Sequence, residues 1–127
     1  MSARSPRRTP DAAAVQAATA RIASVLDDPA AGPASAADLR LVTRALLDRL
    51  AGAAPGRSVE VRVPPYAAVQ CVAGPRHTRG TPGGVVETDP LTWVRLATGR
   101  LAWRDAVIAG LVRASGERAD LTRYLPL

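Results

Sequence analysis

The residue in this sequence best suited to acid–base chemistry is His77, the only histidine in the chain. It lies between Arg76 and Arg79 in a segment rich in glycine. A histidine acts as a general base when a second side chain orients it and a nucleophile lies within hydrogen-bonding distance. The sequence supplies no obvious partner of either kind. We therefore interpret His77 as a solvated loop residue and expect no enzymatic activity.

Cys71 is the only cysteine, which excludes an internal disulfide and the paired-cysteine spacings of zinc sites. It follows Ala67 and Val69 at a spacing of two, which places the three side chains on one face of a β-strand. A cysteine on an apolar face behaves as a small hydrophobic residue, whereas a nucleophilic thiol needs exposure and positive surroundings. We predict that Cys71 is buried, and we expect neither a bound metal nor a cofactor.

The segment from Arg76 to Gly84 reads Arg-His-Thr-Arg-Gly-Thr-Pro-Gly-Gly. The guanidinium groups of Arg76 and Arg79, together with backbone N–H groups of a glycine-rich loop, could hold a phosphate or a carboxylate. The segment lacks the Lys-Ser/Thr ending of a nucleotide-binding P-loop. The alternative is a long polar connection between strands. If the ligand is anionic, we predict that Arg76 and Arg79 bind its head group.

Trp93 and Trp103 lie on either side of Gly99, on two short predicted helices. Large aromatic side chains at such a corner usually close a hydrophobic core. The alternative is that both tryptophans line an apolar pocket together with Leu96 and Val107. These four residues are the candidate pocket residues.

The net charge of +6 raises the question of nucleic-acid binding, and all 17 basic residues are arginine. Without Arg4, Arg7 and Arg8 the net charge falls from +6 to +3, which is ordinary for a protein surface. Aromatic residues make up only 3% of the chain, so base stacking would be difficult to supply.

The sequence shows neither the apolar core of a secretory signal nor a membrane-spanning run, so we expect a cytoplasmic protein.

Two helices are predicted before the first strand. The start signal of the first helix has three parts: Thr9 as N-cap, Pro10 in the first turn, and Asp11 near the positive end of the helix dipole. Ser35 is the predicted N-cap of the second helix, which ends at Gly52. The apolar stripes are Val15, Ala18, Ile22, Val25 and Leu26 in the first helix and Leu39, Val42, Leu46 and Leu50 in the second. We expect an antiparallel helical pair that lies on a sheet.

The clearest strand signal is in residues 57–63, where Val59, Val61 and Val63 alternate with polar residues. This alternation predicts one buried and one solvated face. Residues 66–73 are apolar on nearly both faces, which indicates a more central strand. The later elements are expected in this order: a strand at 85–88, a helix from Asp89-Pro90 to Gly99, a helix at 102–109, a strand at 111–115 and a helical turn at 119–124.

Because the helices and strands are segregated along the chain, the sequence favours an α+β fold over an α/β fold. We expect an antiparallel sheet with helices packed on one face and two N-terminal helices before it. Residues 1–8 are predicted to form a disordered basic segment. Residues 9–127 are predicted to form a single domain, with the helical pair at 9–52 and the sheet with its short helices at 57–127.

The stretch from Arg57 to Leu127 resembles the bacterial sterol-carrier-protein-like (SCP-2-like) family. The resemblance rests on Val-Arg-Val-Pro-Pro-Tyr-Ala-Ala-Val-Gln-Cys-Val at 61–72, Arg-His-Thr-Arg-Gly-Thr-Pro at 76–82, Asp-Pro-Leu-Thr-Trp-Val-Arg-Leu-Ala-Thr-Gly at 89–99 and Val-Arg-Ala-Ser-Gly-Glu-Arg-Ala-Asp-Leu at 112–121. The glycines at 99, 110 and 116 punctuate this part of the chain as in that family. The resemblance implies helices on one face of an antiparallel sheet, enclosing an apolar cavity for a lipid-like ligand.

The leading hypothesis is therefore binding or transfer of a small apolar or amphipathic molecule, such as a fatty acyl compound or lipid, without chemistry. The ligand would lie in a cavity between the sheet and the helices. An alternative is a protein-interaction domain whose core is filled by its own side chains and binds no small molecule. A third hypothesis is nucleic-acid binding through arginine.

Overall fold

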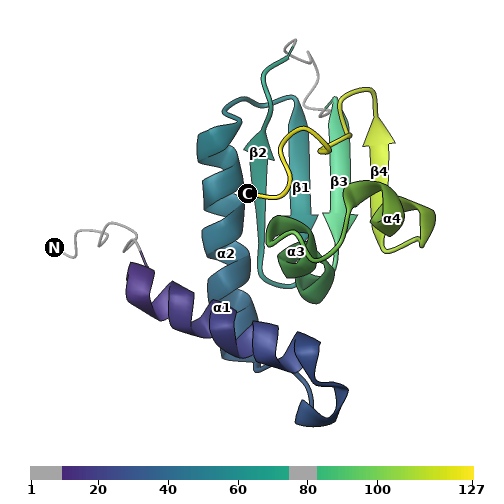
Figure 1. Cartoon of the computed structure of the whole chain (residues 1–127). Helices are drawn as coiled ribbons and strands as arrows, with labels where there is room; N and C mark the ends of the chain where they lie inside the picture. Colours follow the sequence, from purple (N-terminus) through teal and green to yellow (C-terminus); the bar gives the residue numbers. More distant parts are fainter. Residues whose placement is uncertain (1–9, 75–82) are drawn as a thin grey trace, which may run out of the picture.

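The computed structural model describes residues 10–74 and 83–127 of the chain. The helices are α1 (Ala12–Asp27), a 3-10 turn η1 (Pro29–Ala31), α2 (Ala36–Ala53), α3 (Pro90–Ala97) and α4 (Trp103–Ile108). The strands are β1 (Val59–Val63), β2 (Ala67–Cys71), β3 (Gly84–Thr88) and β4 (Val112–Gly116). This is the α+β fold that the sequence predicts, with the elements in the expected order (Figure 1).

Short polar side chains begin the longer helices. The Ser35 hydroxyl accepts a hydrogen bond from the Asp38 N–H at 3.0 Å, so the predicted start of α2 is confirmed. Asp89 caps α3 in the same way, since its carboxylate accepts from the Thr92 N–H at 3.1 Å. The N-cap of α1 is Asp11, whose carboxylate accepts from the Ala13 N–H, and the prediction of Thr9 was wrong. Threonine and aspartate can both cap a helix, and the position of a helix end is uncertain by one or two residues from sequence alone.

The strands form one mixed sheet in the order β2-β1-β3-β4. β1 pairs antiparallel with β2, and β3 pairs antiparallel with β4, but β1 and β3 run parallel, with Val61 opposite Val86. The sequence analysis predicted a purely antiparallel sheet, and the parallel pairing of β1 with β3 corrects that prediction. The β1–β2 hairpin returns the chain to the end of the sheet at which β1 began, and β3 also starts there, with Gly84 opposite Val59. β3 must therefore run in the direction of β1.

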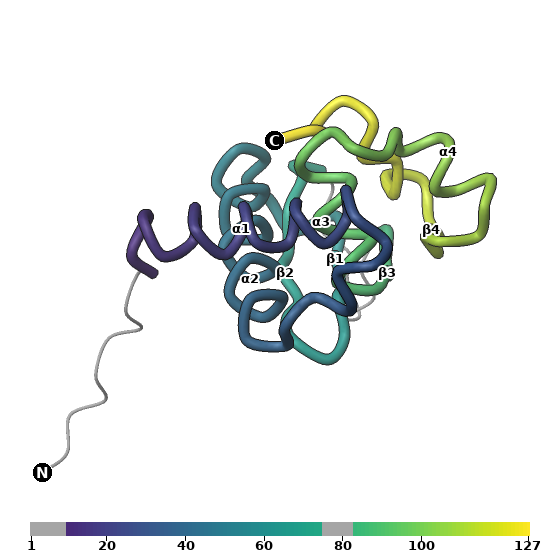
Figure 2. Tube along the Cα trace, turned by 60° about the horizontal axis from the view of Figure 1, so that its bottom comes forward, coloured from purple at the N-terminus to yellow at the C-terminus, as the bar shows by residue number. Residues whose placement is uncertain are grey.

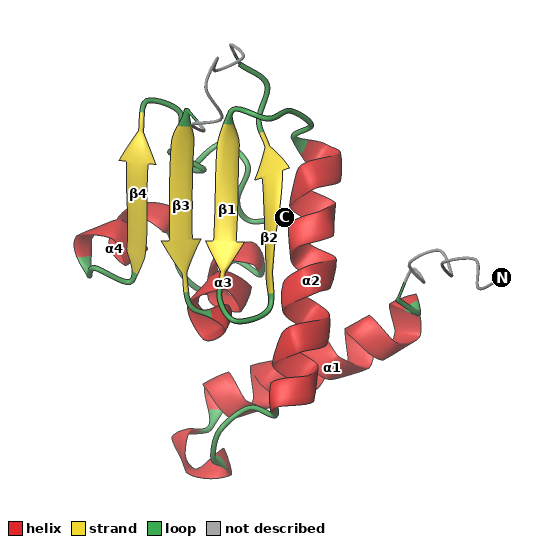
Figure 3. Cartoon of the chain, turned by 180° about the vertical axis from the view of Figure 1, so that it is seen from behind, coloured by secondary structure: helices red, strands yellow, loops and turns green. Residues whose placement is uncertain are grey.

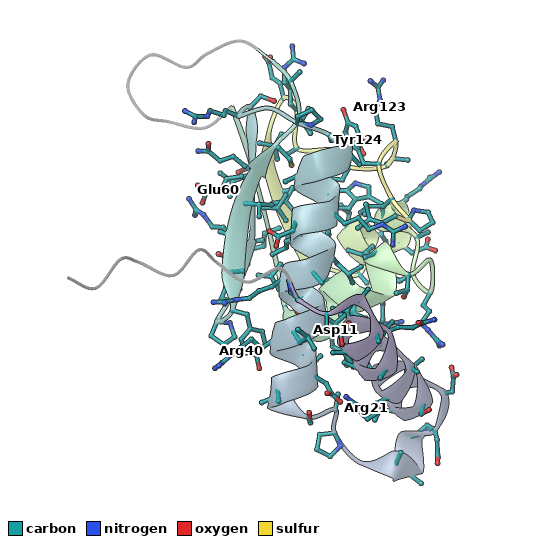
Figure 4. The ribbon with its side chains drawn as sticks, turned by 90° about the vertical axis from the view of Figure 1, so that its left-hand side faces the viewer. Asp11, Arg21, Arg40, Glu60, Arg123 and Tyr124 are labelled. Atoms are coloured by element: carbon teal, nitrogen blue, oxygen red, sulfur yellow. The ribbon has the colours of Figure 1, made fainter. Side chains whose placement is uncertain are left out.

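The helices cover one face of this sheet, as predicted (Figures 1 and 3). Val59, Val61 and Val63 are buried on the covered face, while Glu60 and Arg62 lie on the other face. Figure 4 shows Glu60 pointing away from the helices. The alternation in the sequence follows directly from this one-sided burial.

β2 lies at an edge of the sheet, so the prediction of a central strand was wrong. Ala67 and Val69 are only half-buried, although Cys71 is fully buried. α2 runs alongside β2 and covers its apolar side chains, which accounts for an apolar strand at an edge (Figure 1). Arg44 of α2 donates to the carbonyl oxygen of Tyr66 at 3.3 Å and holds the hairpin turn against the helix.

α1 crosses α2 instead of lying beside it on the sheet, so the expected helical pair is only partly correct. Figure 2 shows α1 across the end of the molecule, over α2 and α3. Ala18 and Ile22 of α1 are buried in the core. Arg21 pairs with Asp38 of α2 at 2.9 Å, and Asp27 pairs with Arg100 after α3 at 2.5 Å. The crossing arrangement allows α1 to reach both helices.

Candidate ligand-binding site

Trp93, the first candidate pocket residue, is a core residue. Its side chain is buried, and the indole Nε1–H donates to the carbonyl oxygen of Thr43 on α2 at 3.3 Å. A buried indole needs such a partner for its N–H group. Trp93 therefore joins α3 to α2 and fills the space under the sheet. It does not line the pockets described below.

Leu96 and Trp103 lie together at a pocket of about 290 Å³. This pocket, which we call the apolar pocket, opens between the α3–α4 connection and the C-terminal segment. Its lining residues are Leu96, Gly99, Leu101, Ala102, Trp103, Arg104, Thr122, Leu125 and Pro126. Val107 lies farther along α4, is 40% exposed and does not contribute to the lining. The structure thus brings together two of the four candidates.

Backbone geometry at both ends of the apolar pocket shapes it. Gly99 has a φ of +82°, a conformation that favours glycine, and this allows the chain to turn sharply after α3. The Leu127 N–H donates to the carbonyl oxygen of Ala97 at 2.9 Å, which fixes the C-terminal segment against the end of α3. Leu125 and Pro126 thereby become one wall. Residues so close to the end of the sequence carried no periodic signal that could have identified them.

A second pocket of about 440 Å³, the polar pocket, adjoins the first, because Thr122 lines both. Its lining residues are Val72, Glu117, Arg118, Asp120, Thr122, Arg123 and Tyr124. In Figure 4, Arg123 projects outward from the C-terminal segment, with Tyr124 on the same segment. Arg118 donates to the carbonyl oxygen of Ala73 at 3.4 Å. The two adjoining pockets therefore place apolar surface next to two guanidinium groups.

Asp120 is held in place within the polar pocket. Its carboxylate accepts hydrogen bonds from the hydroxyl of Thr122 at 2.5 Å and from the backbone N–H of Thr122 at 2.9 Å. These two hydrogen bonds lower the pKa of Asp120 below its ordinary value. These hydrogen bonds fix the turn at 122–124. The Tyr124 N–H closes the turn by donating to the carbonyl oxygen of Leu121. The helical turn expected at 119–124 is thus this shorter turn.

Val72, at the wall of the polar pocket, has a strained backbone. Its φ is +66°, which is rare for a β-branched residue. The conformation is held by Ser58, whose N–H and hydroxyl both donate to the carbonyl oxygen of Val72, at 3.0 and 2.6 Å. Strained residues persist where neighbouring contacts fix them, and they cluster at functional sites.

The predicted head-group residues Arg76 and Arg79, and also His77, lie outside the described residues. The described chain on either side of that segment lies close to the polar pocket. A Cβ atom built on Gly74 would lie 2.9 Å from Nε of Arg118, and one built on Gly84 would lie 3.1 Å from the backbone nitrogen of Ala119.

Cys71 is fully buried on β2, as the sequence predicted. Desolvation by burial raises the pKa of its thiol to about 11. At neutral pH the group is therefore a thiol and not a thiolate, and it is a poor nucleophile.

Two kinds of feature are absent from residues 10–74 and 83–127. No group of three or more His, Cys, Asp or Glu side chains in this part of the chain is arranged to hold a metal ion. None of the helices described is both long and apolar enough to cross a membrane.

The family comparison covers most of the chain. A family model described as a bacterial SCP ortholog, where SCP denotes sterol carrier protein, matches residues 35–127. The match begins at Ser35, the N-cap of α2, so it includes α2, the whole sheet and both pockets, while α1 lies outside it. No curated protein matches this chain. The chain belongs to the bacterial sterol-carrier-protein-like family.

Proposed function

We propose that this protein binds and carries a small amphipathic, lipid-like molecule without catalysing a reaction on it. The observation that carries the proposal is the junction of the apolar and polar pockets at Thr122 in a member of a carrier family. Ligand sites are typically apolar clefts with a few polar groups that orient the ligand. The two pockets together have this composition.

The apolar end of the ligand would lie against Leu101, Trp103 and Leu125. The volume of about 290 Å³ is at the lower end of the range for small-molecule sites, which suits part of an acyl chain. The sequence analysis predicted that the ligand cavity lies between the sheet and the helices. That layer is occupied by buried side chains, Trp93 and Leu47 among them, so we propose the site beside the C-terminal segment instead.

The polar end of the ligand would lie near Arg118 and Arg123. Glu117 and Asp120 also line this pocket, but Asp120 is engaged by Thr122. Arg76 and Arg79 remain proposed head-group residues, because they follow closely in sequence on Gly74, which lies beside Arg118. Guanidinium groups bind carboxylates and phosphates with charge-assisted hydrogen bonds. We therefore propose an anionic head group.

Titration of the full chain with cis-parinaric acid, a fluorescent fatty acid, tests the site. Ala102→Leu adds volume at an exposed position that lines the apolar pocket, and Ala20→Leu is the matched control on the exposed face of α1. We expect Ala102→Leu to weaken binding by about tenfold, because forcing a side chain into occupied space typically costs about 1–3 kcal/mol. Equal affinities of the two variants would refute this site.

The polar end is tested by the double variant Arg118→Gln, Arg123→Gln, with Arg49→Gln as an exposed control on α2. Loss of charge-assisted hydrogen bonds should weaken binding of the fatty acid by about tenfold or more. Binding of the corresponding fatty alcohol should be unaffected, because it has no charge for the arginines to recognise. Equal losses for the acid and the alcohol would contradict an anionic head group.

The second candidate is a protein-interaction domain that binds no small molecule. It is favoured by the filled layer between the sheet and the helices, where Val59, Val61, Leu47 and Leu50 are completely buried. Native mass spectrometry of freshly purified protein separates the two candidates. A co-purifying lipid supports the carrier, and a bare mass together with no parinaric acid binding supports the interaction domain.

A further inference from the structure

Strand β4 forms an open edge of the sheet. In the part of the chain that the structure describes, β4 and β2 are the two outermost strands. Four of the five residues of β4 are exposed, and only Val112 is buried. Figure 3 shows α4 behind the end at which β4 begins. By contrast, α2 runs alongside β2 (Figure 1). The edge at β4 is therefore the more accessible of the two.

The hydrogen bonds of β3 determine which backbone groups of β4 point outward. The Gly84 N–H donates to the carbonyl oxygen of Ser58, on the side of β1, at 2.9 Å. Backbone groups of successive strand residues point to opposite edges, so those of Val85 point toward β4, where Val85 pairs with Ser115. The backbone groups of Ser115 therefore point inward, toward β3. The residues of β4 whose N–H and C=O groups point outward are Val112, Ala114 and Gly116.

Most of these outward groups have no partner among residues 10–74 and 83–127. The one hydrogen bond to them in this part of the chain comes from the Ala119 N–H, which donates to the carbonyl oxygen of Gly116 at 3.4 Å. The N–H and C=O groups of Val112 and Ala114 form no hydrogen bond with the described residues on their outer side. A row of unpaired backbone groups at a sheet edge is a template for another strand.

We propose that β4 pairs antiparallel with β4 of a second copy of the chain, about a two-fold axis at Ala114. An axis at this residue pairs all five residues of both strands, with Val112 opposite Gly116 of the second copy. The three outward residues are symmetric about Ala114, so they all meet as hydrogen-bonded pairs, as a two-fold interface requires. The two sheets would become one continuous sheet. This proposal goes beyond the carrier function and does not depend on it.

The side chains along β4 favour this register. Ala114 is small and exposed, so two copies of it can face each other at the axis without a clash. Arg113 would lie opposite Ser115 of the second copy. An axis at Arg113 would instead bring two guanidinium groups face to face, which is destabilising. Glu87 pairs with Arg113 across β3 and β4, and their side chains approach to 4.0 Å, so the charge of Arg113 is partly compensated within its own chain.

Analytical ultracentrifugation of the full chain across the micromolar range tests the pairing. A short strand pair is smaller than a standard interface, so we expect a reversible dimer with a Kd on the order of 10–100 μM. Ala114→Pro removes an outward N–H at the axis, which an edge strand tolerates. This variant should weaken the dimer by about tenfold or more, because each copy loses a hydrogen bond. Ala68→Pro, at an exposed position of β2, is the matched control and should dimerise like the wild type.

A cross-link keeps the test independent of folding defects in the proline variants. Ala114→Cys should form a disulfide between two copies on mild oxidation, because residues paired at the axis lie about 5.5 Å apart between their Cα atoms. Gln70→Cys, at an exposed position of β2, should not form one at the same concentration. A wild type that stays monomeric, equal dimerisation by the wild type and Ala114→Pro, or equal cross-linking of the two cysteine variants would overturn the proposal. Parinaric acid binding reports separately on the pockets.

Discussion

The indole N–H of Trp93 donates to the backbone carbonyl of Thr43, 50 residues earlier in the chain, at 3.3 Å. Both residues are buried, and the contact joins α3 to α2 beneath the sheet. For Trp93, closure of the core is therefore the correct one of the two interpretations that the sequence left open. The pair leads to two predictions.

Trp93→Ala should lower the free energy of unfolding by about 3–5 kcal/mol, because it leaves a large cavity and removes a buried hydrogen bond. Trp93→Phe should lower it by less and should leave parinaric acid binding unchanged, because Trp93 does not line the apolar pocket. Urea unfolding followed by circular dichroism measures the first effect. A loss below about 1 kcal/mol for Trp93→Ala would contradict a core role.

Thr43→Val should raise the free energy of unfolding by about 1 kcal/mol. The hydroxyl Oγ1 of Thr43 is buried and has no hydrogen-bond partner among the residues that the structure describes, and valine has nearly the same shape without a polar atom. Thermal unfolding of the variant and the wild type checks this. A lower melting temperature for Thr43→Val would show that the hydroxyl has a bonding partner in solution.

The stability of the protein should fall between about pH 9 and pH 11 because of Cys71. Burial raises the pKa of this thiol from 9.0 to about 11, so above pH 9 the unfolded chain loses a proton that the folded chain retains. The stability contribution is complete below pH 9 and is lost as the pH rises toward 11. Urea midpoints across this range should fall less steeply for Cys71→Ala than for the wild type. Equal slopes would indicate that the thiol is solvated.

Ile22→Ala should destabilise the protein by about 2–5 kcal/mol in a single unfolding transition. Ile22 is buried in the core, although α1 lies outside residues 35–127 that match the family model. Gln16→Ala, at an exposed position of the same helix, is the control and should change stability little. Two separate transitions, or no effect of Ile22→Ala, would show that α1 is not an integral part of the packed core.

Local patterns in the sequence determined which side chains face inward within each element. The alternation of Val59, Val61 and Val63 indicated their burial, Ser35 and Asp89 marked helix starts, and Cys71 followed the apolar face of its strand. These features depend on neighbours a few residues away, through strand and helix periodicity and capping. They could be read without knowledge of the fold.

Only the tertiary structure decided which buried face meets which partner. The parallel pairing of β1 with β3 and the edge position of β2 follow from where the chain returns after the hairpin. The pocket depends on Leu125 lying beside Trp103, and the exposure of Val107 depends on which side of α4 faces the core. Periodicity specifies a side of an element, whereas contacts between distant segments depend on how the whole core is filled.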